Sequence, residues 1–271
     1  MKVIEKSITG KAGAERCEDG MAVGNDFVAV VDGSTSKSHV AFHPEMSNGR
    51  YCMTLVVECI KALAADADCR LFCQQATDIV RAAYGRSEEL MDRLAHHPTE
   101  RMAASAAIYS QARQEVWLVG DCQCLVDGRL YENPKPYEEL IAEMRSSFIR
   151  LQLKQGRALA DFQEHDDGRD FILPVLIDSC RYQNQTFAVI DGFNIPIDKV
   201  LIIDVSQANE IVLATDGYPF LLPTWGESEE ALARQLRDDP LRIGRYKATK
   251  GMMKGLCSFD DRSYIRLQLR S

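Results

Sequence analysis

Long hydrophobic runs are missing from this sequence: no apolar stretch approaches the roughly 20 residues that a membrane-spanning helix needs. An excess of positive charge is missing as well, since the formal net charge is -8. These absences argue against a membrane-spanning protein and against nucleic acid or an anionic membrane as a partner. The Met1–Lys6 segment is charged and lacks the apolar core of a signal peptide.

Disulfide and zinc patterns are also missing, although the chain has nine cysteines. Their number is odd, and neither Cys69 with Cys73 nor Cys122 with Cys124 has a partner pair at zinc-finger spacing. We therefore interpret the cysteines as core or surface thiols of a protein in the reducing cytoplasm.

No internal repeat, low-complexity tract or break in composition divides the chain, so we expect a single domain over residues 1–271. Apolar residues recurring at helical spacing predict helices over 49–66, 70–94, 136–157 and 227–237. Short apolar or alternating segments predict strands over 2–9, 21–32, 101–110, 115–119, 122–130 (with a turn at Asp127–Gly128), 185–190, 199–204, 210–215 and 264–269. The polar stretch 161–170 is interpreted as an exposed loop or flap near a functional edge.

Several predicted strands end at acidic residues. The apolar run Phe27–Gly33 stops at Asp-Gly, and Ile211–Gly217 repeats the pattern far away in the sequence. Asp260–Asp261 comes just before the last strand, and Glu18–Asp19 comes before an early one. Acids at separate strand ends are what a fold needs to gather carboxylates around a hard cation, and the Gly33 carbonyl is a further oxygen ligand.

Taken in order, these motifs resemble those of the metal-dependent serine/threonine protein phosphatases of type 2C, the PPM family, in a bacterial-like form. The resemblance extends over nearly the whole chain. The matching segments are Glu18-Asp19, Val31-Asp32-Gly33, Ala103 to Ala107, Val119-Gly120-Asp121, Thr215-Asp216-Gly217 and Asp260-Asp261-Arg262-Ser263. The resemblance implies an α+β fold, a four-layer αββα sandwich of two antiparallel β-sheets flanked by helices, with a two-metal site at one end.

The resemblance also implies roles for the acids. Asp32 would bridge two Mg²⁺ or Mn²⁺ ions, with the Gly33 carbonyl as a further ligand, and Asp216 and Asp260 would bind the same ion. Oxygen ligands suit these cations better than zinc or copper. Two such ions activate a water for attack on a phosphoryl group, so no cysteine nucleophile is needed. Consistent with this, no cysteine lies in a Cys-x5-Arg loop.

Three further acids complete the implied metal site. Glu18 would act on the second ion through water, with Asp19 supporting it. Asp121 would help to form a third, looser site. The catalytic set implied by the resemblance is Asp32, Glu18, Asp216 and Asp260.

The phosphate-binding residue is the main departure from the family pattern. Ala14 stands where many members have an arginine. Arg16 lies two positions later and would share a strand face with that position, so we take it as a candidate substitute. Lys37, in a polar loop after Gly33, and Arg169, in the polar stretch, are the other candidates.

The function indicated is hydrolysis of phosphoserine or phosphothreonine in a protein substrate. Two alternatives stay open: a phosphatase of a small phosphorylated molecule, and a catalytically weak regulatory or binding module. Retention of Asp32, Asp216 and Asp260 favours catalysis, because clustered carboxylates cost stability without a cation. The sequence does not indicate an oligomeric state.

Overall fold

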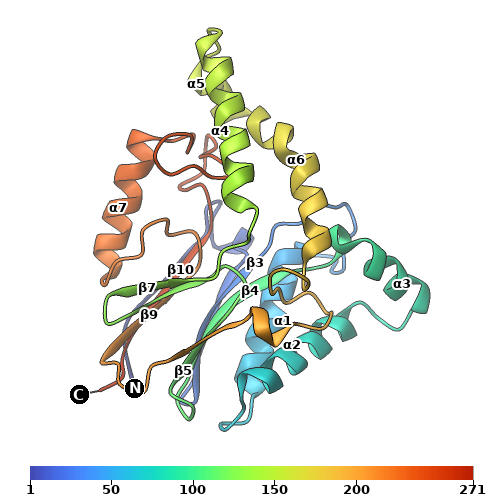
Figure 1. Ribbon diagram of the computed structural model, residues 1–271, viewed down its shortest axis with the longest axis vertical. Coiled ribbons are helices and arrows are strands. Elements are labelled where there is room, and N and C mark those ends of the chain that lie inside the picture. Colours follow the sequence, from blue (N-terminus) through green and yellow to red (C-terminus); the bar gives the residue numbers. More distant parts are fainter. Residues whose placement is uncertain (271) are drawn as a thin grey trace.

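Two antiparallel β-sheets form the centre of the structure, a computed structural model that describes residues 1–270 (Figure 1). One sheet has the strand order β2-β3-β4-β5-β8 and the other β1-β10-β9-β6-β7. The strands are β1 (Lys2–Thr9), β2 (Asp19–Val23), β3 (Phe27–Gly33), β4 (Ala104–Ser110), β5 (Glu115–Val119), β6 (Gln123–Val126), β7 (Arg129–Glu132), β8 (Leu201–Asp204), β9 (Glu210–Ala214) and β10 (Arg262–Gln268). The predicted class, an α+β sandwich of two antiparallel sheets with helices around them, is confirmed.

The helices flank the sheets and extend beyond them at one end. They are α1 (Asn48–Ala62), α2 (Cys69–Ala83), α3 (Glu88–His96), α4 (Glu138–Lys154), α5 (Leu159–Glu164), α6 (Asp167–Ser179) and α7 (Trp225–Asp238). Helices α1 and α2 cover the first sheet, α7 lies near β1 of the second, and α4 to α6 rise away from the strands (Figure 1). The single-domain organisation stays a prediction.

Strand β3 is apolar along its length because both of its faces are buried. Val28 and Val30 face the second sheet and pack in a cluster that includes Ile265. Ala29 and Val31 point the other way, into the cluster beneath α1 and α2. Alternation of side chains between the two faces of a strand produces this arrangement. The continuous apolar run therefore marks a central strand with a layer on each side.

One early strand prediction is corrected by the sheet pairing. Residues 21–32 do not form one strand, because Gly24 lies at the turn between β2 and β3, which pair antiparallel. Strand β1 is present as predicted, but it belongs to the other sheet and pairs with β10. The predicted strand over 185–190 is absent; this segment makes only isolated bridges, including Ala104 with Ile190.

The helix predicted over 70–94 is two helices, α2 and α3. Gly85, between them, has φ 86°, a left-handed conformation that suits glycine and ends the helical path. Ser87 then begins α3, and its side chain accepts a hydrogen bond from the Leu90 N–H. At α7, Thr224 is the N-cap residue, and its side chain accepts a hydrogen bond from the Glu227 N–H.

Most of the polar stretch 161–170 is helical, with a break at residues 165 and 166, so the loop prediction is wrong. It covers the end of α5 and the start of α6. Asp166 caps α6 by accepting a hydrogen bond from the Arg169 N–H at 2.9 Å. Acidic residues near a helix N-terminus are favourable because they bind free N–H groups and oppose the helix dipole. The polarity of this stretch therefore reflects helix capping.

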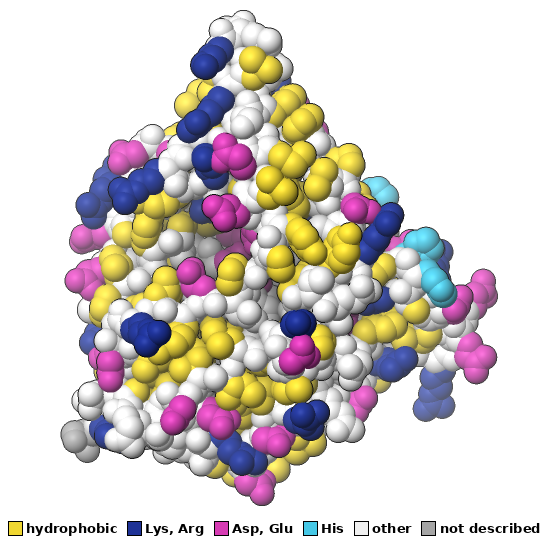
Figure 2. Space-filling model, in the orientation of Figure 1, with side chains coloured by type: hydrophobic (Ala, Val, Ile, Leu, Met, Phe, Trp, Pro, Cys, Tyr) yellow, Lys and Arg dark blue, Asp and Glu magenta, His cyan; other side chains and the backbone are white. Residues whose placement is uncertain are grey.

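Helices α4 and α6 pack against each other as a hairpin. Phe148 of α4 stacks on Phe171 of α6, with ring centroids 4.6 Å apart. Part of the hairpin surface is apolar and exposed, including Leu140 and Val175 (Figure 2). Among the described residues, no helix combines the length and the apolar character needed to cross a membrane.

Candidate functional site

Strand register brings the acidic strand ends to one end of the sandwich. Asp32, near the end of β3, lies opposite Ser105 at the start of β4. The end of β5 pairs with the start of β4, and Asp121 follows β5. The end of β9 pairs with the start of β10, so Asp216, after β9, and Asp260, before β10, belong to the same end. Antiparallel pairing thus gathers acids that are far apart in the sequence.

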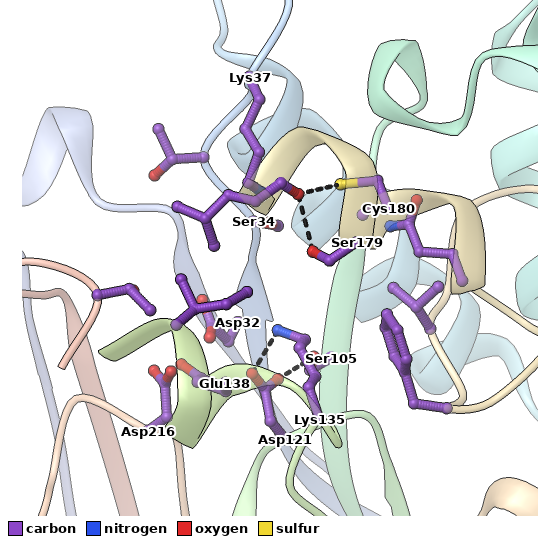
Figure 3. A pocket seen from close by; sticks show the side chains of 18 of the residues that line it. Asp32, Ser34, Lys37, Ser105, Asp121, Lys135, Glu138, Ser179, Cys180 and Asp216 are labelled. Carbon is purple, nitrogen blue, oxygen red and sulfur yellow. Dashed lines mark hydrogen bonds and ion pairs between the residues drawn. The ribbon is translucent and has the colours of Figure 1, made fainter. Parts of the chain in front are cut away.

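A cavity of about 140 Å³ lies among these acids. In Figure 3 the labelled carboxylates lie on its lower side and Lys37 on its upper side. Helices α4 and α6 contribute Glu138, Ile141, Arg169 and Leu176 to its wall. Of the predicted ligands, the lining includes Asp32, Gly33, Asp121, Asp216 and Asp260.

Burial and like charges raise the pKa of three of the acids. The pKa of Asp32 lies well above its ordinary value, first because of burial and then because of Asp216 and Asp19. Burial, followed by Asp260, raises the pKa of Asp216 to about 7. Burial raises the pKa of Asp19 to about 8, against the effect of its hydrogen bond with Thr215. Within the described residues, none of these three carboxyls forms an ion pair with a cationic side chain, although Lys250 partly offsets the rise at Asp216.

Two other pocket acids, Asp260 and Asp121, have lysine partners. Lys11 Nζ lies 3.0 Å from Asp260 Oδ1, and Lys250 is ion-paired with Asp260 Oδ2. Lys135 is ion-paired with Asp121. Burial alone would raise the pKa of Asp260 and Asp121, but the lysines hold both below the ordinary value. A divalent cation at either of these two acids therefore competes with an ammonium group.

Sequence reasoning does not identify Lys11, Lys135 or Lys250 as site residues. Each lies in a turn or loop outside the acidic motifs, and only tertiary packing brings it to the cavity or to Asp260. The Pro134–Pro136 segment, which has Lys135 at its centre, is the one usable signal. Two prolines restrict the backbone around the residue between them, which is a way to hold a side chain in place.

Glu18 is held by hydroxyl groups near the start of α1. Ser47 Oγ donates to Glu18 Oε1 at 2.6 Å, and Thr35 Oγ1 donates to Oε2. Glycine is required beside it: a Cβ at Gly33 would lie 2.1 Å from the Gly49 carbonyl oxygen, and one at Gly49 would lie 2.6 Å from Glu18 Oε1. The glycines allow α1 to begin directly against this acid.

Asp19 lies directly opposite Asp32 in the β2–β3 pair. Its Oδ2 accepts a hydrogen bond from Thr215 Oγ1 at 2.8 Å. Its Oδ1 is buried and has no hydrogen-bond partner within residues 1–270. A buried carboxylate oxygen without a partner is costly, and a cation or a water bound to one would satisfy it.

Among residues 1–270, no three of the pocket acids have ligand atoms that all lie within 4.8 Å of one another. Within the described chain, one group of at least three acidic, histidine or cysteine side chains has ligand atoms all within 4.8 Å of one another: His165, Asp167 and Asp170. That group lies at the start of α6, and His165 and Asp170 are exposed. Hydrogen bonds and ion pairs within such an exposed group account for it without an ion. The fit of the pocket acids to cations therefore rests on their donor type and unbalanced charge.

The three predicted phosphate ligands have different positions. Lys37 and Arg169 line the cavity. Burial lowers the pKa of Lys37, with further effects from nearby cations, and no carboxylate pairs with it among residues 1–270. Arg16 lies in the 3-10 helix Ala14–Arg16, is exposed and is outside the cavity lining. The strand geometry on which its predicted role depends is absent there.

Comparison with known proteins finds similar solved structures. A bacterial serine phosphatase is 12% identical, with 98% of each chain covered and a TM-score of 0.48. The serine/threonine phosphatase Stp1 from Staphylococcus aureus is 13% identical, covering 100% of this chain and 96% of that one, with a TM-score of 0.47. The catalytic domain of the serine/threonine protein phosphatase PstP, in complex with two manganese ions, is 17% identical, with 97% of each chain covered and a TM-score of 0.41.

This likeness is one of fold. Each of these structures carries the name of a serine or serine/threonine phosphatase. No family model matches the chain, and no curated protein matches it in sequence. Activity and substrate are therefore argued from the site itself.

The raised pKa values predict how stability depends on pH without a metal. Between the ordinary carboxyl pKa near 4 and the values of about 7 and 8 at Asp216 and Asp19, the folded chain binds more protons than the unfolded chain. Stability should therefore fall as pH rises through this range. Asp121 and Asp260 add no slope, because their lowered pKa keeps them ionised in both states.

Thermal unfolding in EDTA at about pH 5.5 and about pH 8 tests this dependence. We expect the lower midpoint at the higher pH, and a smaller difference when Mg²⁺ replaces EDTA. An Asp216→Asn variant should show a flatter dependence. A midpoint that rises with pH in EDTA would contradict the assigned charge states.

Proposed function

We propose that this chain is a metal-dependent phosphomonoester hydrolase that removes phosphate from phosphoserine or phosphothreonine in proteins. The observation that carries the proposal is the unbalanced acid cluster. Asp32 and Asp216 line the cavity without a cation partner among the described residues, and both have a raised pKa. Such a cluster destabilises a protein unless a ligand uses it.

The donor set fits two hard cations. Asp32, Asp216 and Asp260 with the Gly33 carbonyl would hold them, and Asp19, with its unpartnered oxygen, supports the site from the adjacent strand. Bound there, Mg²⁺ or Mn²⁺ supplies two effects, a lowered pKa for water and stabilisation of charge on the phosphoryl group. All of the donors are oxygens, which these cations prefer.

Cationic side chains in the same cavity suit a phosphate. Lys37, Arg169 and Lys250 all line it. In Figure 3 Lys37 lies on the side opposite the labelled carboxylates, and Lys250 is ion-paired with Asp260. Arg169 is fixed in part by donating from Nη1 to the Thr249 carbonyl at 3.0 Å. A guanidinium retains further N–H groups for a phosphate oxygen. These residues bind and orient the substrate anion in place of the arginine missing at Ala14.

Substitution of Arg169 should separate the phosphate candidates. We expect Arg169→Ala to raise KM for a phosphomonoester about tenfold or more, because hydrogen bonds to charged groups contribute about 1.5–3 kcal/mol. Arg16→Ala is the matched control and should leave KM nearly unchanged, since Arg16 is exposed and outside the cavity lining. Steady-state kinetics with metal affinity measured in parallel checks both. A larger rise in KM in Arg16→Ala than in Arg169→Ala would indicate that Arg16, and not Arg169, binds the phosphate.

One observation favours a second candidate, a regulatory or binding module. Both carboxylate oxygens of Asp260 have lysine partners, Lys11 and Lys250, so the protein itself partly neutralises a central metal ligand. If the lysines hold Asp260 permanently, the cavity would bind a phosphorylated partner without hydrolysing it.

Phosphate release from a phosphothreonine peptide, a phosphoserine peptide and a small phosphorylated alcohol, each with Mn²⁺, distinguishes the candidates. The proposal predicts that the peptides are hydrolysed with the higher kcat/KM. Faster turnover of the small alcohol would favour the small-molecule phosphatase. Peptide binding without phosphate release would favour the regulatory module.

A further inference from the structure

The carboxylate of Asp121 has a partner in the protein for each of its oxygens. Its Oδ2 is ion-paired with Lys135 Nζ, and its Oδ1 accepts a hydrogen bond from Ser105 Oγ at 2.5 Å (Figure 3). The Asp121 side chain is only 7% exposed. Both carboxylate oxygens therefore have partners, and a third divalent cation at this acid would have to displace an ammonium group.

Lys135 is held at this position by its own backbone. It lies between Pro134 and Pro136, whose rings fix their own φ angles and restrict the residues before them. Asn133, just before this segment, donates from Nδ2 to the Lys199 carbonyl at 3.0 Å. On the other side, the Glu138 N–H donates to the Lys135 carbonyl at 3.1 Å as α4 begins. The ammonium is thus positioned by a constrained segment tied at both ends.

Charge balance distinguishes this acid from the rest of the cluster. Asp19, Asp32 and Asp216 have no lysine partner within the described chain, so the cluster around Asp260 keeps surplus negative charge despite its own two lysines. Asp121 has a lysine of its own, and against the effect of burial Asp121 and then Glu138 raise the pKa of Lys135, so its ammonium stays charged. A divalent cation is attracted by the surplus negative charge around Asp260, whereas at Asp121 an ammonium group already neutralises the carboxylate.

We infer that Lys135 is a built-in cation that takes the place of a third metal ion at Asp121, so that the chain binds two divalent cations. The inference differs from the third site at Asp121 that the family resemblance implies. The inference rests on the proposed metal site, and it does not require that the site hydrolyse any particular substrate.

Counting bound Mn²⁺ tests the inference directly. Equilibrium dialysis at saturating Mn²⁺, followed by metal analysis, should give two ions per chain for the native protein and three for Lys135→Met. The double variant Lys135→Met/Asp121→Asn should return to two. Lys247→Met is the matched control, because Lys247 pairs with the exposed Glu143 and is outside the cavity lining. It should also bind two.

Any other number of bound Mn²⁺ ions contradicts the inference, the proposed function or both. Three ions on the native chain would overturn the inference and leave the proposed function standing. Two ions on Lys135→Met would show that Lys135 does not exclude the third. No bound ion on the native chain would overturn the proposed function and the inference together. If Lys135→Met does not fold, Lys135→Gln, which keeps one donor for Asp121, carries the same expectation of three ions.

Discussion

Asp32→Asn is expected to abolish hydrolysis and, at the same time, to raise the thermal stability of the metal-free chain. Asp32 lines the cavity, and its pKa lies well above the ordinary value because of burial and the nearby Asp216 and Asp19. Asparagine keeps nearly the same shape and removes one of the repelling charges. No described side chain loses a hydrogen bond or an ion pair, since none is made to the Asp32 carboxylate.

The activity loss should be large. Changes that only support a metal ligand typically cost about 10–100-fold in metal affinity or activity, and Asp32 is itself a proposed ligand of both ions, so we expect a loss greater than about 100-fold. Thermal unfolding in EDTA and hydrolysis with Mn²⁺ measure the two effects. Asp66→Asn, at an exposed acid in the turn before α2, is the control and should change neither. Retained activity in Asp32→Asn would refute the site assignment.

Arg145→Met is expected to produce the largest loss of stability. Arg145 is fully buried in α4, and its Nη2 lies 2.6 Å from Asp166 Oδ2 at the start of α6. Its Nη1 donates to the Leu241 carbonyl at 2.8 Å, and Asp166 Oδ2 accepts from the Gly251 N–H at 3.2 Å. One ion pair thus joins the α4–α6 hairpin to the loop that carries Lys250.

Removing one partner of a buried ion pair typically costs about 3–5 kcal/mol, because the other charge stays buried and uncompensated. Chemical denaturation should show a loss of this size in Arg145→Met, with faster hydrogen exchange around residues 241–251. Arg93→Met is the control: its pair with Glu100 is at the surface, where such pairs contribute about 0–1 kcal/mol. A loss below 1 kcal/mol in Arg145→Met would contradict the connecting role of this pair.

The sheets and the acids could be predicted from sequence because their signals are local. An apolar run that ends at Asp32 and Gly33 shows both the central strand and the acid at its end. The same holds for β9 with Asp216. Once the fold class is known, antiparallel pairing brings these ends together without further information.

The parts that could not be predicted depend on tertiary packing or on a conflicting local signal. Lys11, Lys135 and Lys250 lie in turns and loops, and no periodic pattern shows which acids they meet. Helix α6 is not recognised from the sequence because its first turn is acidic and Pro174 lies inside it. An acidic first turn is nevertheless typical of a helix N-terminus. Arg16 lies near the site in sequence but is exposed in a short 3-10 helix.

Hydrolysis of p-nitrophenyl phosphate at neutral to alkaline pH tests the central claim most directly. The native chain and Asp216→Ala would each be assayed with Mn²⁺, with Mg²⁺ and with EDTA. We expect hydrolysis by the native chain only when a divalent cation is present, and none by the variant. Activity that persists in EDTA or in Asp216→Ala, or a folded native chain that binds Mn²⁺ and shows no hydrolysis, would contradict it.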